Sequence, residues 1–375
     1  MRPALLGLVA DDLTGAGDSA AGFADAGWTA VLALRPWGLS RPTGPGPTVL
    51  ALSTGARADA DVEAAARTAQ AVDALVEAGA ERLYLKVDST VRGSVAGQVA
   101  GALAAWSRHR PRTYAVVCPA FPTQQRAVVA GEVLVAGAPL ARSAAALDPV
   151  TPRADGDLMR VLPGAVLHRG LDLTGPPGAL LIADAAVDAD LDRLARWVDD
   201  AGPDLVVVGS GGLAAALGRR WAAPALRGPV PAVPGRLLLA VSSLHPASAD
   251  QLRRLRAASF PDVDVLTTGT GTVAPRAAAA ELAERVAAAL HSRPYEGLVL
   301  VGGDGAAAIL ARLGADGVRI DGAVVPGSPT GVIADGEAAG LRLVTRSGGF
   351  GAPDALHEIV RTLRATCAPT PEEAP

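Results

Sequence analysis

The chain has 375 residues, half of them hydrophobic and 3% aromatic, with a formal net charge of −4 at pH 7. Since one domain usually has about 100–200 residues, we expect two cores, built mainly from aliphatic side chains. Acidic and basic residues are interspersed, which excludes the clustered Lys/Arg footprint of a nucleic-acid-binding protein. No apolar run reaches the roughly 18 residues that a membrane-spanning helix needs, so no membrane partner is expected.

Up to residue 223 the chain alternates short apolar runs with alanine-rich amphipathic stretches. This pattern predicts βα units around a mainly parallel sheet. Residues 139–178 are punctuated by Pro and Gly and should hold loops and short elements. Strands are predicted at residues 5–10, 29–34, 48–52, 82–87, 114–118, 180–183 and 205–208, and helices at 15–26, 60–78, 95–106, 191–201 and 212–221.

A stretch with four prolines and two glycines, residues 224–235, is the predicted linker between two α/β domains. The predicted domains are residues 1–228 and 229–366, each a mainly parallel sheet flanked by helices, and residues 367–375 should be a disordered tail. In the second domain we predict strands at 236–241, 263–267 and 298–301, helices at 247–258 and 274–290, a helix from Gly305, and two more short strands.

Two cysteines, Cys118 and Cys367, cannot form a disulfide framework. The first apolar run, residues 5–10, is too short for the core of a signal peptide and leads directly into Asp11 and Asp12. Together these features favour a reducing compartment, and the cytoplasm is the expected location.

Lys86 is the only lysine among 34 basic residues. Because arginine fills every other basic position, a retained lysine suggests a place that needs a compact ammonium group. Lys86 and Asp88 fall on one face of a predicted strand, and Ser89, Thr90 and Arg92 follow in the turn. Cations, hydroxyls and a carboxylate together suit a small polyhydroxy carboxylate. The alternative is a surface Lys–Asp pair that caps the next helix.

Residues 10–18 follow the first predicted strand and contain two adjacent carboxylates, Asp11 and Asp12. Ligands of open α/β sheets bind beyond the carboxyl ends of strands, where carboxylates can accept hydrogen bonds from hydroxyl groups. Thr14 and the amides of residues 15–17 lie at a helix N-terminus, which favours an anion. The alternative is a simple helix cap by Asp12 or Thr14. A stiff loop at 118–126 presents Gln125 and Arg126 and is equally well explained as a structural turn.

Three glycine-rich turns in the second domain are expected at helix starts, where backbone amides can come close to phosphate oxygens. No segment fits the P-loop motif or an early dinucleotide-binding fingerprint, and the five histidines have no metal-ligand spacing. Magnesium carried in with a nucleotide would need no motif of its own. The turns contain Gly302, Gly303, Asp304 and Gly305, then Gly327, then Gly348, Gly349 and Gly351.

In their order along the chain, these segments resemble the four-carbon acid sugar kinase family. Ala-Asp-Asp-Leu-Thr-Gly at 10–15, Lys-Val-Asp-Ser-Thr-Val-Arg-Gly at 86–93 and Pro-Ala-Phe-Pro at 119–122 match its sugar-binding domain. Gly-Gly-Asp at 302–304, Pro-Gly at 326–327 and Ser-Gly-Gly-Phe-Gly at 347–351 match its nucleotide-binding domain. The resemblance implies a kinase that uses ATP and Mg²⁺ on threonate, erythronate or a 3-oxo-tetronate. The expected active site is the interdomain cleft, and a homodimer is left open.

The resemblance implies that Asp12, Arg57 and residues 86–90 contact the acid, and that Ser243 and the glycine turns at 302–305 and 348–351 surround ATP. The chain departs from the family at Ser242, where glycine is usual, at His245, where serine is usual, and at Gly305, where threonine is common. Residues 53–57 read Ser-Thr-Gly-Ala-Arg, where the family usually carries an acidic residue and a serine before the arginine.

The hypothesis is in-line transfer of the γ-phosphoryl group to a terminal hydroxyl, with Asp12, Lys86 and Asp88 as catalytic residues. Either carboxylate could be the base. Lys86 could hold the carboxylate of the acid or the phosphoryl group in transfer, with Asp11, Arg57 and Arg92 in the same site. One alternative is a ribokinase-like kinase, because residues 12–18 mimic its anion-hole motif, which comes late in that family's chain. The other is a non-catalytic sensor of the same fold.

Overall fold

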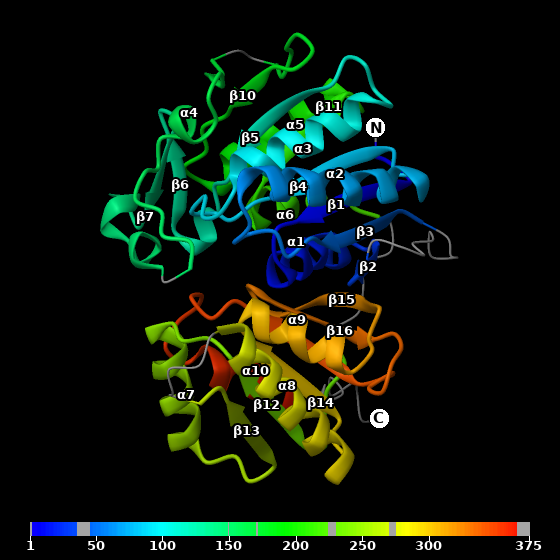
Figure 1. Cartoon of the computed structure of the whole chain (residues 1–375), viewed down its shortest axis with the longest axis vertical. Coiled ribbons are helices and arrows are strands. Elements are labelled where there is room, and N and C mark those ends of the chain that lie inside the picture. The colour runs from blue at the N-terminus through cyan, green and yellow to red at the C-terminus, as the bar shows by residue number, and fades with distance from the viewer. Residues whose placement is uncertain are drawn as a thin grey trace, which may run out of the picture. The chain divides into compact units, whose positions relative to one another are not determined.

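The computed structural model describes residues 2–35, 46–148, 150–169, 172–223, 230–269 and 275–365. The chain divides into two compact units, Met1–Arg227 and Gly228–Pro375, which are treated separately (Figure 1). Residues 224–229 of the predicted linker and the predicted tail at 367–375 lie outside the described residues. Within the described ranges, no helix combines the length and the apolar character needed to cross a membrane.

The first unit is built on a parallel sheet with the strand order β2-β3-β1-β4-β11-β5-β10-β9. Strands β1, β4, β5 and β11 are buried along their whole length, because both faces of the sheet are covered by helices. The strands are β1 (Leu5–Ala10), β2 (Thr29–Ala33), β3 (Thr48–Ser53), β4 (Arg82–Lys86), β5 (Tyr114–Cys118), β9 (Val166–Leu167), β10 (Leu180–Ile182) and β11 (Leu205–Gly209).

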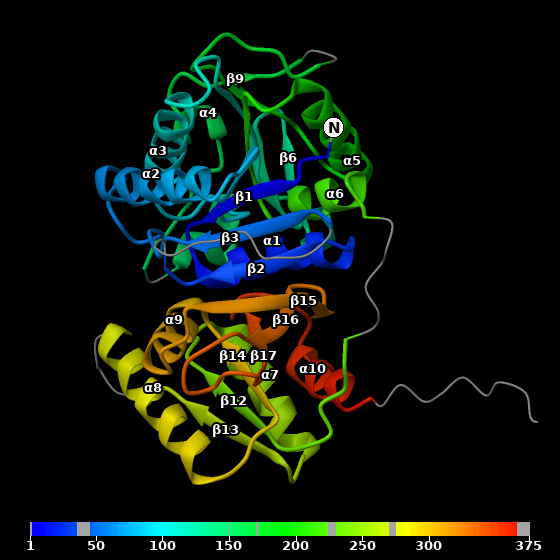
Figure 2. The same cartoon turned by 90° about the vertical axis from the view of Figure 1, so that its right-hand side faces the viewer.

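Helices α2 and α3 pack on one face of this sheet, and α1, α5 and α6 pack on the other (Figure 2). Gly97 and Gly101 let α3 approach the backbone of α2, since a Cβ at either position would lie 2.2 Å from a carbonyl oxygen of α2. The predicted helices are confirmed to within a few residues: α1 (Leu13–Asp25), α2 (Asp61–Glu77), α3 (Val95–Ser107), α5 (Asp188–Ala201) and α6 (Gly211–Arg220).

A small antiparallel sheet of β6 (Arg126–Val129), β7 (Glu132–Val135) and β8 (Ala138–Pro139) follows β5, with the short helix α4 (Leu158–Val161) beyond it. Ala130 and Gly131 both have positive φ angles, of 53° and 79°, as a tight two-residue hairpin turn requires. The stiff loop predicted at 118–126 is therefore the approach to this sheet, and Arg126 begins β6.

The second unit has the strand order β13-β12-β14-β17-β16-β15. The first four are parallel, whereas β16 is antiparallel to both of its neighbours. Helices α8 and α9 cover one face, and α7 and α10 the other (Figure 2). The elements are β12 (Leu237–Val241), α7 (Pro246–Ala258), β13 (Val263–Thr267), α8 (Pro275–Ser292), β14 (Gly297–Val301), α9 (Gly303–Arg312), β15 (Gly317–Val325), β16 (Ser328–Ile333), β17 (Arg342–Arg346) and α10 (Ala355–Arg364).

The α/β fold with mainly parallel sheets flanked by helices is confirmed, but two expectations for the second unit are wrong. Three strands follow α9 instead of two. Gly327 lies in the tight turn of the β15–β16 hairpin, with φ +75°, and so does not precede a helix. A Pro-Gly turn signal alone does not distinguish a hairpin from a strand-to-helix turn. Helix α10, which buries Leu356, Ile359 and Leu363, was also not predicted.

Candidate functional site

Three neighbouring strands bring the predicted acid-binding residues of the first unit together. Strand β1 lies between β3 and β4, and Ala10 is in register with both Ser53 and Lys86. Because these strands are parallel, the segments that follow their carboxyl ends leave the sheet at the same edge. The turn after β1 contributes Asp11 and Asp12, and the segment after β3 contributes Arg57.

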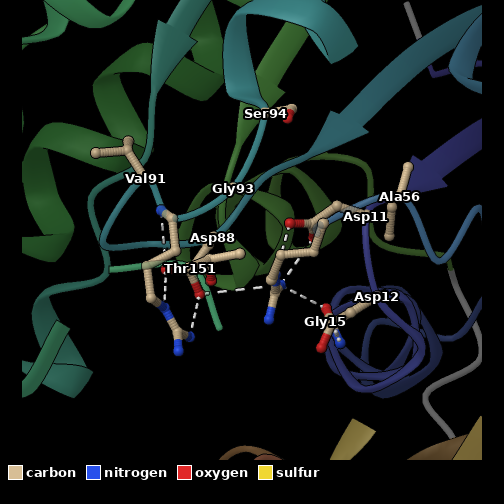
Figure 3. A network of polar contacts seen from close by, with 12 residues as sticks. Asp11, Asp12, Gly15, Ala56, Asp88, Val91, Gly93, Ser94 and Thr151 are labelled. Carbon is tan, nitrogen blue, oxygen red and sulfur yellow. Dashed lines mark hydrogen bonds and ion pairs between the residues drawn. The ribbon is translucent and has the colours of Figure 1, made fainter. Parts of the chain in front are cut away.

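Arg57 is the centre of a network of three carboxylates. Its Nε and Nη2 donate hydrogen bonds to the two oxygens of Asp11, at 2.7 and 2.8 Å, and Nη2 also donates to Asp12 Oδ1 at 2.8 Å. Asp88 Oδ1 lies 3.9 Å from the same nitrogen. Figure 3 shows Asp11, Asp12 and Asp88 converging on this region. Both oxygens of Asp11 are occupied by Arg57, which makes Asp11 a residue that orients the guanidinium group.

Asp12 combines a structural and a chemical role. Its Oδ1 accepts a hydrogen bond from the Gly15 amide at 3.0 Å, so it is the N-cap of α1, and its Oδ2 accepts one from the Thr14 hydroxyl at 2.6 Å. Burial raises the pKa of Asp12, but Arg57, Lys86 and Thr14 lower it more, and the resulting pKa is below the ordinary value. The carboxyl group is therefore ionised at neutral pH.

The side chain of Lys86 is buried beside the first turn of α1. Lys86 is 6% exposed. A Cβ added to Gly15 would lie 2.4 Å from Lys86 Nζ and 2.5 Å from Asp12 Oδ1. Within the described residues, Lys86 makes no hydrogen bond and no ion pair. A buried ammonium group held this way retains its capacity to bind an incoming anion.

Asp88 is held by its own turn. It accepts hydrogen bonds from the hydroxyl and the amide of Thr90, the latter at 3.1 Å, and from Arg92 Nε and Nη2 at 2.9 and 2.8 Å. Burial raises the pKa of Asp88, but Arg92, Arg57 and Thr90 outweigh burial and hold it well below the ordinary value. Arg92 is fixed on its other side by Asp148 at 2.7 Å. Ser89 lies in the same turn, with a buried hydroxyl that has no partner among the described residues.

Apart from Gly327, which lies in the β15–β16 hairpin, the predicted nucleotide residues of the second unit lie at the carboxyl ends of three parallel strands, where Val241, Val301 and Arg346 are in register. The glycine turns follow β14 and β17. A Cβ at Gly348 would lie 1.9 Å from Ser243 Oγ, which shows how closely the loop at 347–351 approaches the loop after β12. Glycines at such close approaches, a helix N-terminus and nearby hydroxyls fit the phosphates of a nucleotide.

Three polar side chains that fix the loop at 347–351 were not predicted. Arg346, 1% exposed, donates hydrogen bonds to Ser328 Oγ at 2.8 Å and to the Phe350 carbonyl. Ser248 donates to the Gly348 carbonyl at 2.7 Å, and Gln251 donates to the carbonyls of Phe350 and Ala352. Polar residues three apart on the buried face of α7 were the signal that could have identified Ser248 and Gln251.

The departure at position 245 has a structural explanation. His245 is the N-cap of α7, and its Nδ1 accepts a hydrogen bond from the Ala247 amide at 3.1 Å. This is the bond that a serine hydroxyl would accept at an N-cap.

Asp18 is the last residue of the segment that mimics an anion-hole motif. It lies against the start of α6, where a Cβ at Gly211 would meet its Oδ2 at 2.3 Å.

The described residues contain no group of three or more His, Cys, Asp or Glu side chains arranged to hold a metal ion. The ionisable groups of the first unit form instead a set of carboxylates and cations that suits a ligand with both hydroxyl and acidic groups.

Two family models match the chain: a sugar-binding N-terminal domain over residues 6–174 and a nucleotide-binding C-terminal domain over residues 261–356. A D-threonate kinase of Bordetella bronchiseptica is 36% identical, with 96% of this chain and 97% of that protein covered. A 3-oxo-tetronate kinase of Cupriavidus necator is 28% identical, with 96% and 98% covered.

Solved structures resemble the chain over the same extent. One from Bordetella bronchiseptica, a domain-swapped dimer with bound citrate, has 34% identity and a TM-score of 0.52, covering 96% of this chain and 98% of that one. One from Salmonella typhimurium has a TM-score of 0.78 at 22% identity, covering 96% and 99%, and shows the fold. Family models match both the sugar-binding and the nucleotide-binding domain, and a 36% identical kinase covers nearly the full length. The chain therefore belongs to the four-carbon acid sugar kinase family.

Proposed function

We propose that the protein transfers the γ-phosphoryl group of ATP to a terminal hydroxyl of a four-carbon sugar acid. The observation that carries this proposal is the cluster at the ends of β3, β1 and β4, in which Arg57 bridges Asp11 and Asp12 and Lys86 is left without a partner among the described residues. The names of the relatives, D-threonate kinase and 3-oxo-tetronate kinase, support the same substrate class.

Asp12 is the proposed general base. Arg57 binds both oxygens of Asp11, and Arg92 binds both oxygens of Asp88, whereas Asp12 Oδ2 accepts a hydrogen bond from the Thr14 hydroxyl, which can rotate toward another acceptor. Asp12 is the most exposed of the three carboxylates, with 15% of its side chain accessible against 0% and 6%. As the acceptor hydroxyl bonds to the γ-phosphorus and ADP leaves, the hydroxyl proton passes to Asp12.

Cations hold the acid group in this proposal. Among the described residues, the ammonium group of Lys86 has no hydrogen-bond or ion-pair partner, whereas the guanidinium groups of Arg57 and Arg92 are already fixed by Asp11 and Asp88. Lys86 is therefore the better candidate to bind the carboxylate of the acid, whose negative charge enters the site only with the substrate. That a relative was solved with citrate, a hydroxy acid, supports an acidic ligand.

On the nucleotide side, the turns at 302–305 and 347–351 would hold the phosphates, and Ser243 would lie beside them. Magnesium bound to the nucleotide supplies charge neutralisation of the phosphates. The proposal requires the two units to bring these turns to the acid site during turnover.

The proposal also places the enzyme in the cytoplasm, where ATP is available. A homodimer is proposed from the relative solved as a domain-swapped dimer, to be tested by light scattering.

The test is ADP release from ATP over a panel of D-threonate, L-threonate, D-erythronate and their 3-oxo forms, with ribose as a control sugar that has no acid group. The proposal expects turnover with one or more of the acids and none with ribose. Binding of an acid without ADP release would instead favour the non-catalytic sensor, and turnover confined to ribose would favour a ribokinase-like enzyme.

A further inference from the structure

Two of the positions at which the chain departs from its family, Ser242 and Gly305, are neighbours in space. Ser242 follows β12 and lies against the first turn of α9. A Cβ added to Gly305 would lie 2.2 Å from Ser242 Oγ and 2.3 Å from its Cβ, and one added to Gly302 would lie 2.4 Å from Oγ. These separations are far below van der Waals contact, so the Ser242 side chain occupies the space beside both glycines.

The backbone does not require glycine at position 305. Gly302 has φ +108°, which favours glycine, but Gly305 is not among the residues with positive φ and lies in the first turn of α9. Glycine within a helix is less favourable than alanine, so its presence here needs another cause. The side chain of Ser242 is that cause, because it fills the volume that any side chain at 305 would need.

The hydroxyl of Ser242 is placed where it can serve a phosphate. The first amides of α9, from Gly303 onward, have no acceptor within the helix and favour an anion. Ser242 Oγ donates to the Val301 carbonyl at 3.1 Å, and the Ser242 amide donates to the same oxygen at 2.9 Å. The hydroxyl can therefore turn to another acceptor while the carbonyl keeps a hydrogen bond.

We infer that Ser242 donates a hydrogen bond to a phosphate oxygen of the bound nucleotide, from the space that a side chain at position 305 would otherwise occupy. The inference rests on the proposed ATP-dependent function. It makes Ser242 and Gly305 an interchangeable pair: the hydroxyl can come from position 242 with no side chain at 305, or from position 305 with none at 242.

The hydroxyl is tested by Ser242→Ala, with Ser292→Ala as the matched control. Ser292 lies in the same unit, is exposed and also donates to a backbone carbonyl, that of Ala289, at the end of α8. We expect Ser242→Ala to raise the KM for ATP and the Kd for Mg²⁺–ADP about 10-fold, the loss of one hydrogen bond to a charged group. The KM for the acid should not change, and Ser292→Ala should behave as the wild type. An unchanged KM and Kd in Ser242→Ala would overturn the inference.

The exchange is tested by Gly305→Thr, Ser242→Gly and the double variant. Gly305→Thr alone should lower the temperature of unfolding and abolish nucleotide binding, because its side chain collides with Ser242. The double variant should recover both stability and a KM for ATP within a few-fold of the wild type. If Gly305→Thr is as stable as the wild type, or if the double variant is no better than Gly305→Thr, the pairing is wrong.

Failure of this inference and failure of the proposed function give different results. Unfolding temperatures measured without nucleotide report the collision of positions 242 and 305 whether or not ATP is the substrate. If the wild type binds no Mg²⁺–ADP in calorimetry, the ATP-dependent function is contradicted and the phosphate role of Ser242 fails with it. If the wild type binds and Ser242→Ala binds equally well, only the role of Ser242 is lost.

Discussion

Lys86 and Asp12 lie on either side of the space above Gly15, which is why a side chain at position 15 would meet both Nζ and Oδ1 within 2.5 Å. Because residue 15 has no side chain, the only lysine of the chain can lie beside Asp12, the cap of the first helix. The arrangement puts an ammonium group near a carboxylate without an ion pair between them, so both remain able to bind a ligand.

Gly15→Ala should favour the helix but lower the activity of the site. Alanine is the better helix former by about 1 kcal/mol, yet its Cβ would displace Lys86 or Asp12. We expect kcat to fall by about 100-fold, the loss caused by removing one positioned electrostatic group. Activity assays and thermal unfolding measured together check this, and unchanged turnover would contradict the geometry.

Lys86→Met should remove turnover and leave nucleotide binding intact. The ammonium group is replaced by an apolar side chain of similar length, so the site loses a charge but little volume. We expect kcat to fall by about 100- to 1,000-fold, with the Kd for Mg²⁺–ADP unchanged in calorimetry. Arg108→Met, which removes an exposed cation paired with Asp73, is the control for general loss of charge. Retained activity in Lys86→Met would exclude a catalytic role.

Asp12→Asn and Asp12→Ala should differ in stability but not in activity. Asparagine can still accept the hydrogen bond from the Gly15 amide and caps helices as well as aspartate, whereas alanine cannot and should cost about 1 kcal/mol. Neither can take a proton from the acceptor hydroxyl, so kcat should fall by about 100-fold or more in both. Turnover by Asp12→Asn at the wild-type rate would move the base to another group.

The stability of the first unit should depend on pH in the acidic range, because of Asp88. Its pKa in the folded state is well below the ordinary value, because Arg92, Arg57 and Thr90 outweigh the effect of burial. A depressed pKa contributes stability that is fully present above the ordinary pKa of about 4 and is lost as the pH falls below it toward the folded-state value.

Asp88→Asn should therefore unfold more easily at pH 7, by about 3 kcal/mol for a broken buried pair, and its stability should change less between pH 5 and pH 2 than that of the wild type. Urea unfolding across this range measures both. Asp73→Asn, at an exposed ion pair, should follow the wild type. Equal acid dependence in Asp88→Asn and wild type would show that the group does not have a depressed pKa.

Gly351→Ala and Gly340→Ala should separate collision from backbone strain. The two glycines have nearly the same φ, +88° and +85°, so alanine at either should cost about 1 kcal/mol. A Cβ at 351 would also lie 1.7 Å from Arg346 Nη2, whereas nothing lies within 4 Å of one at 340. Gly351→Ala alone should raise the KM for ATP, because Arg346 holds the 347–351 loop. Equal KM values in the two variants would contradict that role.

The motifs of the acid site could be predicted from the sequence because they follow apolar runs whose length and pattern indicate buried parallel strands. Lys86, Asp88 and Arg92 lie within eight residues, and their local geometry follows from one strand end. That Arg57 should contact Asp11 and Asp12 could not be predicted from spacing, since it depends on β3 rather than β2 pairing with β1. Arg57 was predicted only through the family resemblance.

The sequence by itself determined the alternation of strands and helices, the glycine turns and the acidic and basic residues at strand ends, because these depend on local periodicity and turn chemistry. The tertiary structure alone decided which turns meet, that Gly327 belongs to a hairpin, and that Arg346, Ser248 and Gln251 hold the 347–351 loop. It also decided that Lys86 lies beside Asp12 without pairing, and that Ser242 fills the space left by Gly305. The physical reason is that strand order and side-chain volume act between residues far apart in the chain, where local pattern carries no information.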